Sequence, residues 1–82
     1  MVEVIFDPKF KQIFSKIKDK LIKEKIIKQI SKIKRNPTVG KSMRNVRRGT
    51  RELYIKPFRL SYAYHIPSAT IFILDLYHKK KQ

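Results

Sequence analysis

The chain has 82 residues and a net charge of +15, because 21 Lys and Arg residues outnumber 6 Asp and Glu residues. So short a chain forms one domain (residues 1–82) with a thin core, which leaves no room for a cofactor domain or a deep substrate cavity. The charge predicts a polyanionic partner: nucleic acid, an anionic membrane surface or an acidic protein. No apolar run approaches the roughly 20 residues that cross a membrane, and the first residues lack the pattern of a signal peptide. We therefore expect a cytoplasmic protein without a membrane partner.

The first half of the chain predicts a short strand and then helices. Apolar residues alternate over residues 1–6, which is typical of a strand. Asp7-Pro8 combines a favoured N-cap with a favoured first helical residue. From there to Asn36-Pro37, apolar residues recur every three or four positions, the spacing of one buried helix face. Asp19 divides this stretch into a hairpin of two helices or one bent helix.

The second half of the chain predicts strands joined by turns. Arg48-Gly49-Thr50 has the composition of a hairpin turn, in which the glycine supplies a positive φ. The apolar run at residues 71–74 indicates a central strand. The expected strands cover residues 43–47, 51–56, 59–66 and 70–77. The fold class is therefore α+β: an N-terminal strand, a two-helix hairpin, then a three- to four-strand, mainly antiparallel sheet with the helices on one face.

Strand parity predicts two different faces for this sheet. Leu60, Tyr62 and Tyr64 share one face and suit contact with the helices, whereas Arg59 and Ser61 alternate to the other face. That second face is expected to be a shallow open surface that gathers cations and aromatic rings. Such a combination suits single-stranded RNA, because phosphates need positive charge and unpaired bases stack on rings.

Several of these features have a structural explanation beside the functional one. The lysines of the helices fit a solvated face as well as a nucleic-acid surface. Tyr62 and Tyr64 fit the core or its rim better than a stacking platform, and Glu52 fits an ion-pair partner better than a catalytic acid. For Arg59 and His78 both explanations stay open.

The sequence contains no standard catalytic constellation. It has no cysteine and only 2 glycines, which excludes thiolate metal sites and a glycine-rich phosphate loop. His65 and His78 lack the spacing and the carboxylate neighbours of a metal site. We therefore expect no metal and no small-molecule cofactor. If the protein is an enzyme, its chemistry relies on Lys, Arg, His and Tyr.

The order of these segments resembles the RelE/ParE superfamily of toxins from bacterial and archaeal toxin–antitoxin modules. The likeness covers almost the whole chain and rests on order and spacing rather than on one specific motif. The segments that carry it are Asp7-Pro8, Asn36-Pro37, Arg51-Glu52-Leu53-Tyr54-Ile55, Phe58-Arg59-Leu60-Ser61-Tyr62 and Tyr77-His78-Lys79-Lys80.

The resemblance implies a toxin of a type II toxin–antitoxin system, neutralised by an acidic antitoxin that wraps around it. RelE-type members enter the ribosome and cut mRNA, so we expect a ribosome-dependent, metal-independent endoribonuclease that inhibits translation. ParE-type members share the fold and act on DNA gyrase without cutting RNA, which is the alternative. A small basic RNA-binding protein without catalysis is the third possibility.

The resemblance also implies roles for individual residues. Arg59 matches a family arginine near the scissile phosphate, where a guanidinium stabilises the charged phosphorane. His78, Lys79 and Lys56 are the expected proton-transfer groups, and histidine is the side-chain type best suited to that role near neutral pH. The expected catalytic residues are thus Arg59, His78, Lys79 and Lys56. The expected nucleic-acid-binding residues are Arg47, Arg48, Arg51, Tyr54, Ser61, Tyr77, Lys80 and Lys81.

Two departures from the family pattern bear on catalysis. Many ribosome-dependent members end in a tail with a tyrosine, whereas no tyrosine follows Lys81 here and Tyr77 is the only substitute nearby. Glu52 and Tyr54 stand where the classical member has lysines. Both departures predict that catalysis is weakened or placed on other groups.

Overall fold

The computed structural model describes residues 2–43 and 49–78 of the chain. This part contains a five-stranded sheet and two helices, which confirms the predicted α+β class with an N-terminal strand and a helical hairpin. The elements are β1 (Glu3–Phe6), α1 (Pro8–Lys16), α2 (Lys20–Arg35), β2 (Lys41–Ser42), β3 (Arg51–Ile55), β4 (Phe58–His65) and β5 (Thr70–His78).

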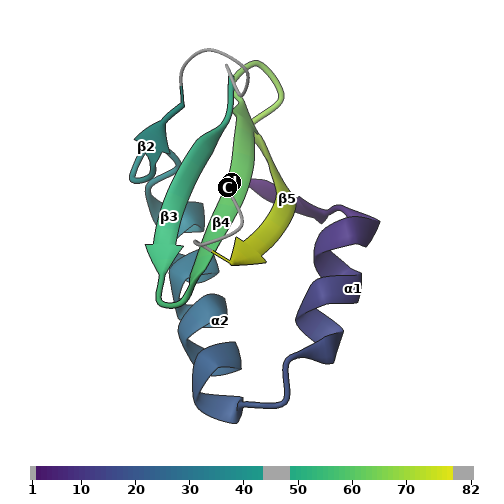
Figure 1. Cartoon of the computed structure of the whole chain (residues 1–82). Helices are drawn as coiled ribbons and strands as arrows, with labels where there is room; N and C mark the ends of the chain where they lie inside the picture. Colours follow the sequence, from purple (N-terminus) through teal and green to yellow (C-terminus); the bar gives the residue numbers. More distant parts are fainter. Residues whose placement is uncertain (1, 44–48, 79–82) are drawn as a thin grey trace.

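The sheet has the order β1-β5-β4-β3-β2, and only the β1–β5 pair is parallel (Figure 1). β5 lies between β1 and β4, which confirms the central strand predicted from its apolar run. A short strand lies at Lys41–Ser42, and of the strand expected over residues 43–47 only Met43, which is not in a strand, belongs to the described part of the chain. Gly49 has a φ of 91°, in agreement with the predicted turn.

Aspartates begin both helices. The Asp7 carboxylate accepts a hydrogen bond from the Lys9 amide, and the Asp19 carboxylate accepts one from the Leu21 amide, so each satisfies a helix N–H that has no partner within its helix. α2 ends at Asn36, directly before Pro37, as predicted. Within the described residues, neither helix is long and apolar enough to cross a membrane.

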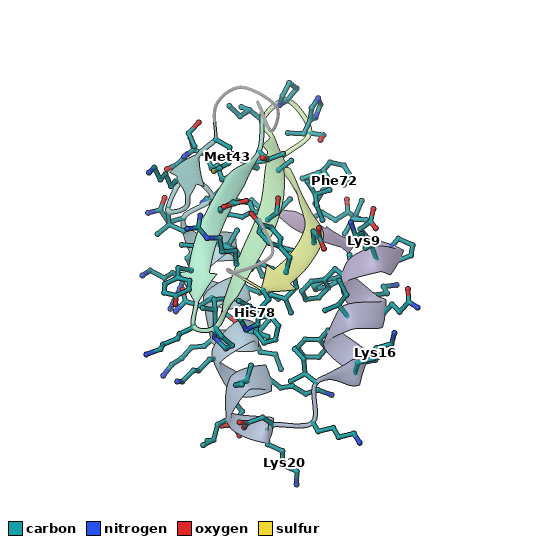
Figure 2. All side chains as sticks on the ribbon, viewed as in Figure 1. Lys9, Lys16, Lys20, Met43, Phe72 and His78 are labelled. Atoms are coloured by element: carbon teal, nitrogen blue, oxygen red, sulfur yellow. The ribbon has the colours of Figure 1, made fainter. Side chains whose placement is uncertain are left out.

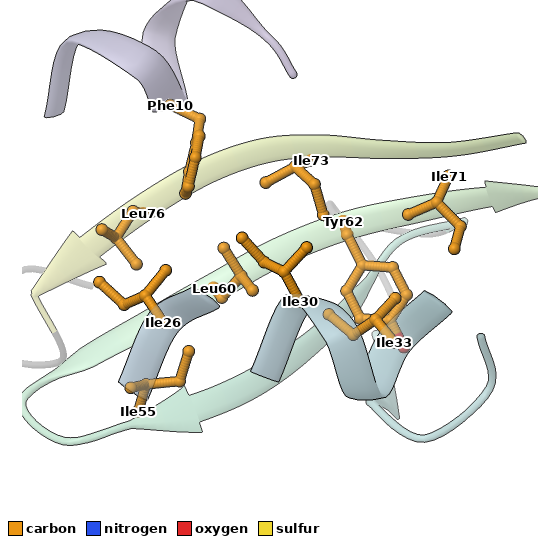
Figure 3. Packing of buried hydrophobic residues seen from close by; sticks show 10 residues of the cluster. All are labelled: Phe10, Ile26, Ile30, Ile33, Ile55, Leu60, Tyr62, Ile71, Ile73 and Leu76. Atoms are coloured by element: carbon orange, nitrogen blue, oxygen red, sulfur yellow. The ribbon is translucent and has the colours of Figure 1, made fainter. Parts of the chain in front are cut away.

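The core lies between the helices and one face of the sheet (Figure 3). Phe10 from α1 packs with isoleucines of α2, and the strands meet them with Leu60, Tyr62 and the apolar residues of β5. The residues that build this core are Phe10, Ile26, Ile30, Ile33, Ile55, Leu60, Tyr62, Ile71, Ile73 and Leu76. The prediction that Leu60 and Tyr62 face the helices is therefore confirmed. The opposite face of β3 and β4 carries no helix (Figure 1).

The loop after α2 is fixed to the sheet by the buried hydroxyl of Tyr62. This hydroxyl donates to the Pro37 carbonyl at 2.7 Å and accepts from the Gly40 amide at 2.9 Å. Burial raises the pKa of Tyr62 above its ordinary value, although the Gly40 hydrogen bond and the charge of Arg51 oppose this shift. Gly40 packs directly on the Tyr62 ring, because a Cβ at position 40 would lie 2.8 Å from the ring.

Candidate nucleic-acid interface

The open face of the sheet presents one cation between two aromatic residues. Tyr54 on β3 pairs with Arg59 on β4, and Arg59 pairs with Tyr77 on β5. Directly opposed residues of neighbouring strands point to the same face, so the three side chains form one row across the sheet. Tyr54 is 53% exposed, which leaves much of its ring accessible.

Glu52, two residues before Tyr54 on the same face of β3, binds two members of this row. Its carboxylate accepts from Arg59 Nη1 at 3.2 Å and also accepts from the Tyr77 hydroxyl. The Glu52 side chain is only 4% exposed, whereas that of Arg59 is 30% exposed. A buried carboxylate needs charged or hydrogen-bonding partners. Glu52 therefore fixes the guanidinium and the Tyr77 ring in place on the open face.

A hollow of about 270 Å³ adjoins Arg59 on the side of β2. Figure 2 labels Met43 at this end of the sheet, directly after β2. The residues that line the hollow are Lys41, Met43, Glu52, Leu53, Tyr54 and Arg59. Apolar walls beside cationic side chains suit a planar base together with its phosphate.

The row of Tyr54, Arg59 and Tyr77 can bind a phosphate by charge and can stack unpaired bases. A guanidinium is planar, stays charged and presents paired N–H groups, which is the chemistry that suits Arg59 to a phosphate. The rings of Tyr54 and Tyr77 on both sides suit stacking of unpaired bases. Within residues 2–43 and 49–78, no group of three or more His, Asp or Glu side chains forms a metal-ligand cluster.

Arg51 lies on the opposite face from Arg59. It pairs with the core residue Tyr62 and donates from Nη1 to the carbonyls of Gly40 (2.8 Å) and Thr38 (3.2 Å). The structure therefore places Arg51 with the loop after α2 rather than with the row of Tyr54, Arg59 and Tyr77. Its parity with Leu53 and Ile55 was a sequence signal for this position.

His78 also lies away from the face of Arg59. It pairs with Phe58, and the two rings meet edge to face with centroids 6.0 Å apart. Phe58 packs against the core, so His78 points to the helix side at the end of β5 (Figure 2). The expected grouping of Arg59 with His78 on one face is not formed, because the register puts Tyr77 rather than His78 opposite Arg59.

The remaining predicted residues are distributed more widely. Ser61 lies on the open face one row from Arg59, opposite Glu52, and it is buried. Lys56 is exposed in the turn between β3 and β4. Arg47, Arg48, Lys79, Lys80 and Lys81 lie outside the described residues.

Sequence reasoning did not foresee the role of Glu52 in this site. It identified an ion-pair partner but not Arg59 as the other member. Glu52 shares strand parity with Tyr54, which was the available signal for its face. The partner could not be read from the sequence, because Glu52 and Arg59 meet diagonally across two strands in a register that only the fold defines.

Comparisons with known proteins agree with this architecture. The RelBE2 toxin–antitoxin complex of Mycobacterium tuberculosis is similar at 24% identity, covering 95% of this chain and 98% of that chain with a TM-score of 0.83. The isolated RelE toxin of E. coli matches at 12% identity, covering 100% and 88% with a TM-score of 0.82. The YoeB-YefM complex of Staphylococcus aureus matches at 23% identity, covering 95% and 98% with a TM-score of 0.77. At these identities the likeness shows the fold.

The sequence itself identifies the family. No curated protein matches the chain significantly. A family model described as the ParE toxin of type II toxin–antitoxin systems matches residues 4–82, which is nearly the whole chain. With the fold and the sequence in agreement, the chain belongs to the ParE toxin family within the RelE/ParE superfamily, and it is a toxin of a type II toxin–antitoxin system.

Proposed function

We propose that this toxin cuts mRNA on the ribosome and thereby inhibits translation. The observation that carries the proposal is the row of Tyr54, Arg59 and Tyr77 on the open face, with Arg59 fixed by the buried Glu52. A preorganised guanidinium between two rings fits a phosphate flanked by unpaired bases. The likeness to RelE and YoeB structures supports the same assignment.

In this proposal the ribose 2′-oxygen attacks the phosphorus and loses its proton to a base, the bond from phosphorus to the 5′-oxygen breaks, and that oxygen leaves as a hydroxyl after taking a proton. The products are a 2′,3′-cyclic phosphate and a new 5′ end, and Arg59 stabilises the negative charge of the intervening phosphorane. Glu52 keeps the guanidinium in position, so little reorganisation is needed during the reaction. Lys56, at the exposed turn beyond Tyr54, is our proposed proton-transfer group among the described residues. Lys79 remains the further proposed group, whereas His78 lies at the end of β5 on the helix side, beside Phe58 and away from the face of Arg59.

A translation extract with a mapped message tests the proposal. The informative variant is Arg59→Gln combined with Glu52→Gln, because it removes the cation and its counterion together and leaves the net charge unchanged. It also avoids a buried carboxylate without a guanidinium partner. We expect the wild-type chain to produce new 5′ ends within ribosome-bound message, and the double variant to produce at least 100-fold fewer, a loss of about 2.7 kcal/mol of transition-state stabilisation.

The same experiment separates the alternatives. Intact message together with inhibited DNA supercoiling in a gyrase assay would contradict the nuclease and support the ParE-like function that the family match favours. RNA binding without cleavage or gyrase inhibition would support the third possibility, a binding protein that uses charge alone.

The cognate partner in our proposal is an acidic antitoxin. A groove of about 600 Å³ runs between β1 and the two helices, with an apolar floor that includes Val4, Phe10 and Ile27 and with Lys11 and Lys34 on its rim. An amphipathic segment with an apolar stripe and acidic flanks fits such a groove. The known structures of similar toxins in complex with antitoxins support a partner of this kind.

Substitution of Ile27, which is 54% exposed, tests this partner without disturbing the core. We expect Ile27→Asp to weaken antitoxin binding more than tenfold, while Leu21→Asp, at an exposed residue outside the groove lining, has little effect. Equal effects of the two changes in an affinity measurement would contradict the groove as the antitoxin site.

A further inference from the structure

Among the described residues, most of the positive charge of this toxin lies on its helices. Residues 8–35 contain 10 lysines and 1 arginine but only 2 acidic residues. Residues 49–78, which hold the row of Arg59, contain 3 cationic and 2 acidic residues. In Figure 1 α2 lies behind the sheet and α1 lies to the side of β5, so the charge of the helices is outside the candidate interface.

Four cations of α2 form one stripe along the helix, which we call the α2 stripe: Lys25, Lys28, Lys32 and Arg35. Their spacing of three, four and three residues puts them on one side of the helix, and all four are exposed. The stripe is about 15 Å long at 1.5 Å per residue. The groove residues Ile27, Ser31 and Lys34 lie on the adjoining side of α2, toward α1.

Among the described residues, no ion pair includes a residue of the α2 stripe. The ion pairs found between described residues join Lys9 to Asp75 and Arg59 to Glu52. Glu24 is the acidic residue of α2, one turn before Lys28. Four like charges at neighbouring helical positions repel one another. Such an arrangement gains stability when a polyanion is bound.

The stripe and the groove differ in the partner that they suit. The groove offers an apolar floor on which a protein segment can pack. The stripe offers regularly spaced cations with little apolar surface, which matches the spaced phosphates of a nucleic-acid backbone.

We propose that the α2 stripe is a second RNA-binding surface, which docks the toxin on the phosphate backbone of double-helical RNA independently of Arg59. The proposal deepens the function proposed above: the stripe supplies affinity through remote contacts, and the open face supplies the chemistry. Contacts made away from the reacting bond can supply the binding energy that positions a substrate. The α2 stripe would do this for an RNA that makes few contacts at the row of Arg59.

Salt-dependent binding to a short RNA duplex tests the stripe directly, using the full-length chain made by total chemical synthesis and refolded. The test variant is Lys25→Gln/Lys28→Gln/Lys32→Gln. The matched control is Lys16→Gln/Lys18→Gln/Lys20→Gln, which removes the same charge from exposed positions around the hairpin tip. The slope of log affinity against log salt should decrease in magnitude by about 2 to 3 for the stripe variant and by less than about 1 for the control.

Three results would overturn the proposal: no change in either variant, equal changes in both, or a stripe variant that keeps duplex binding but loses the acidic antitoxin. Because the duplex assay needs no cleavage, its outcome is independent of the proposed nuclease. If the toxin both cuts mRNA and docks through the α2 stripe, the two variants should also differ in the translation extract. The stripe variant should then need a concentration more than tenfold higher than that of the control variant to reach half-maximal cleavage. Its cleavage rate at saturation then matches that of the control.

Discussion

Arg51 and Arg59 lie on adjacent strands of one sheet, on opposite faces, and bind different partners. Arg51 donates to the backbone carbonyls of the loop after α2, on the helix side. Arg59 binds a buried carboxylate on the open side, next to two tyrosines. The sequence predicts both arginines as residues of a site for a polyanion. The comparison shows that the face on which a cation lies, and the partner that holds it there, determine whether it is available to a ligand.

The largest loss of stability should come from disturbing the close contact between Gly40 and Tyr62, on the face of the sheet where Arg51 lies. Gly40→Val places new methyl groups where a Cβ alone would already lie 2.8 Å from Tyr62 and 3.0 Å from the Glu52 carbonyl. We expect the unfolding free energy in urea to fall by about 3 kcal/mol. Gly49→Ala is the control: its φ of 91° gives backbone strain alone, at a cost of about 1 kcal/mol. Equal losses would contradict the tight packing at Gly40.

Breaking the ion pair between Arg59 and Glu52 should cause the second-largest loss of stability. Arg59→Met leaves the buried Glu52 without its guanidinium, at a cost of about 2 kcal/mol, less than for a fully buried pair because Arg59 is partly exposed. Adding Glu52→Gln should recover most of this loss, since the amide still accepts from Tyr77. Chemical denaturation of the single and double variants checks this, and equal stabilities of the two would contradict it.

Tyr62 gives a smaller effect with a distinct dependence on pH. Tyr62→Phe leaves the Pro37 carbonyl and the Gly40 amide without this partner, which costs about 1 to 2 kcal/mol. Because burial raises the folded-state pKa, the folded protein keeps the phenol proton that the unfolded chain releases above pH 10.0. The stabilisation is therefore complete below pH 10.0 and is lost as pH rises through the folded-state value.

Stability measured against pH from 8 to 11 tests this prediction as the difference between the wild-type chain and Tyr62→Phe. That difference removes the contribution of the many lysines, which is common to both proteins. A difference that stays constant or grows above pH 10.0 would show that the Tyr62 hydroxyl is not protected by burial.

Arg51→Met should have the smallest effect on stability among these changes. The side chain loses its bonds to the carbonyls of Thr38 and Gly40, at a cost of about 1 kcal/mol, because the Tyr62 hydroxyl still holds the loop. Thermal unfolding measures this loss. A variant that fails to fold would show that Arg51, rather than Tyr62, is the main connection between loop and sheet.

Much of the fold could be predicted because local signals and tertiary packing agree. Asp7, Asp19 and Asn36-Pro37 mark helix ends by capping chemistry and by the geometry of proline. The alternation of Leu60 and Tyr62 with Arg59 identified the two faces of β4. These signals act within a few residues, so they are readable without knowledge of the rest of the chain.

The site was less predictable because it depends on contacts between strands. The register that puts Tyr77 rather than His78 opposite Arg59, and the bulge between Ser61 and Tyr62, arise only when β4 and β5 pair. The parallel pairing of β1 with β5 likewise joins strands that are far apart in the sequence, so it could not be read from the pattern of residues 1–6.

The most direct test of the account compares the two arginines in one translation extract, with cleavage of ribosome-bound message measured per folded molecule. The account predicts that Arg51→Met keeps cleavage within about twofold of the wild-type chain. It predicts that Arg59→Gln with Glu52→Gln loses at least about 100-fold, or about 2.7 kcal/mol. Unchanged cleavage by the Arg59 and Glu52 double variant, or an equal loss in Arg51→Met, would contradict it.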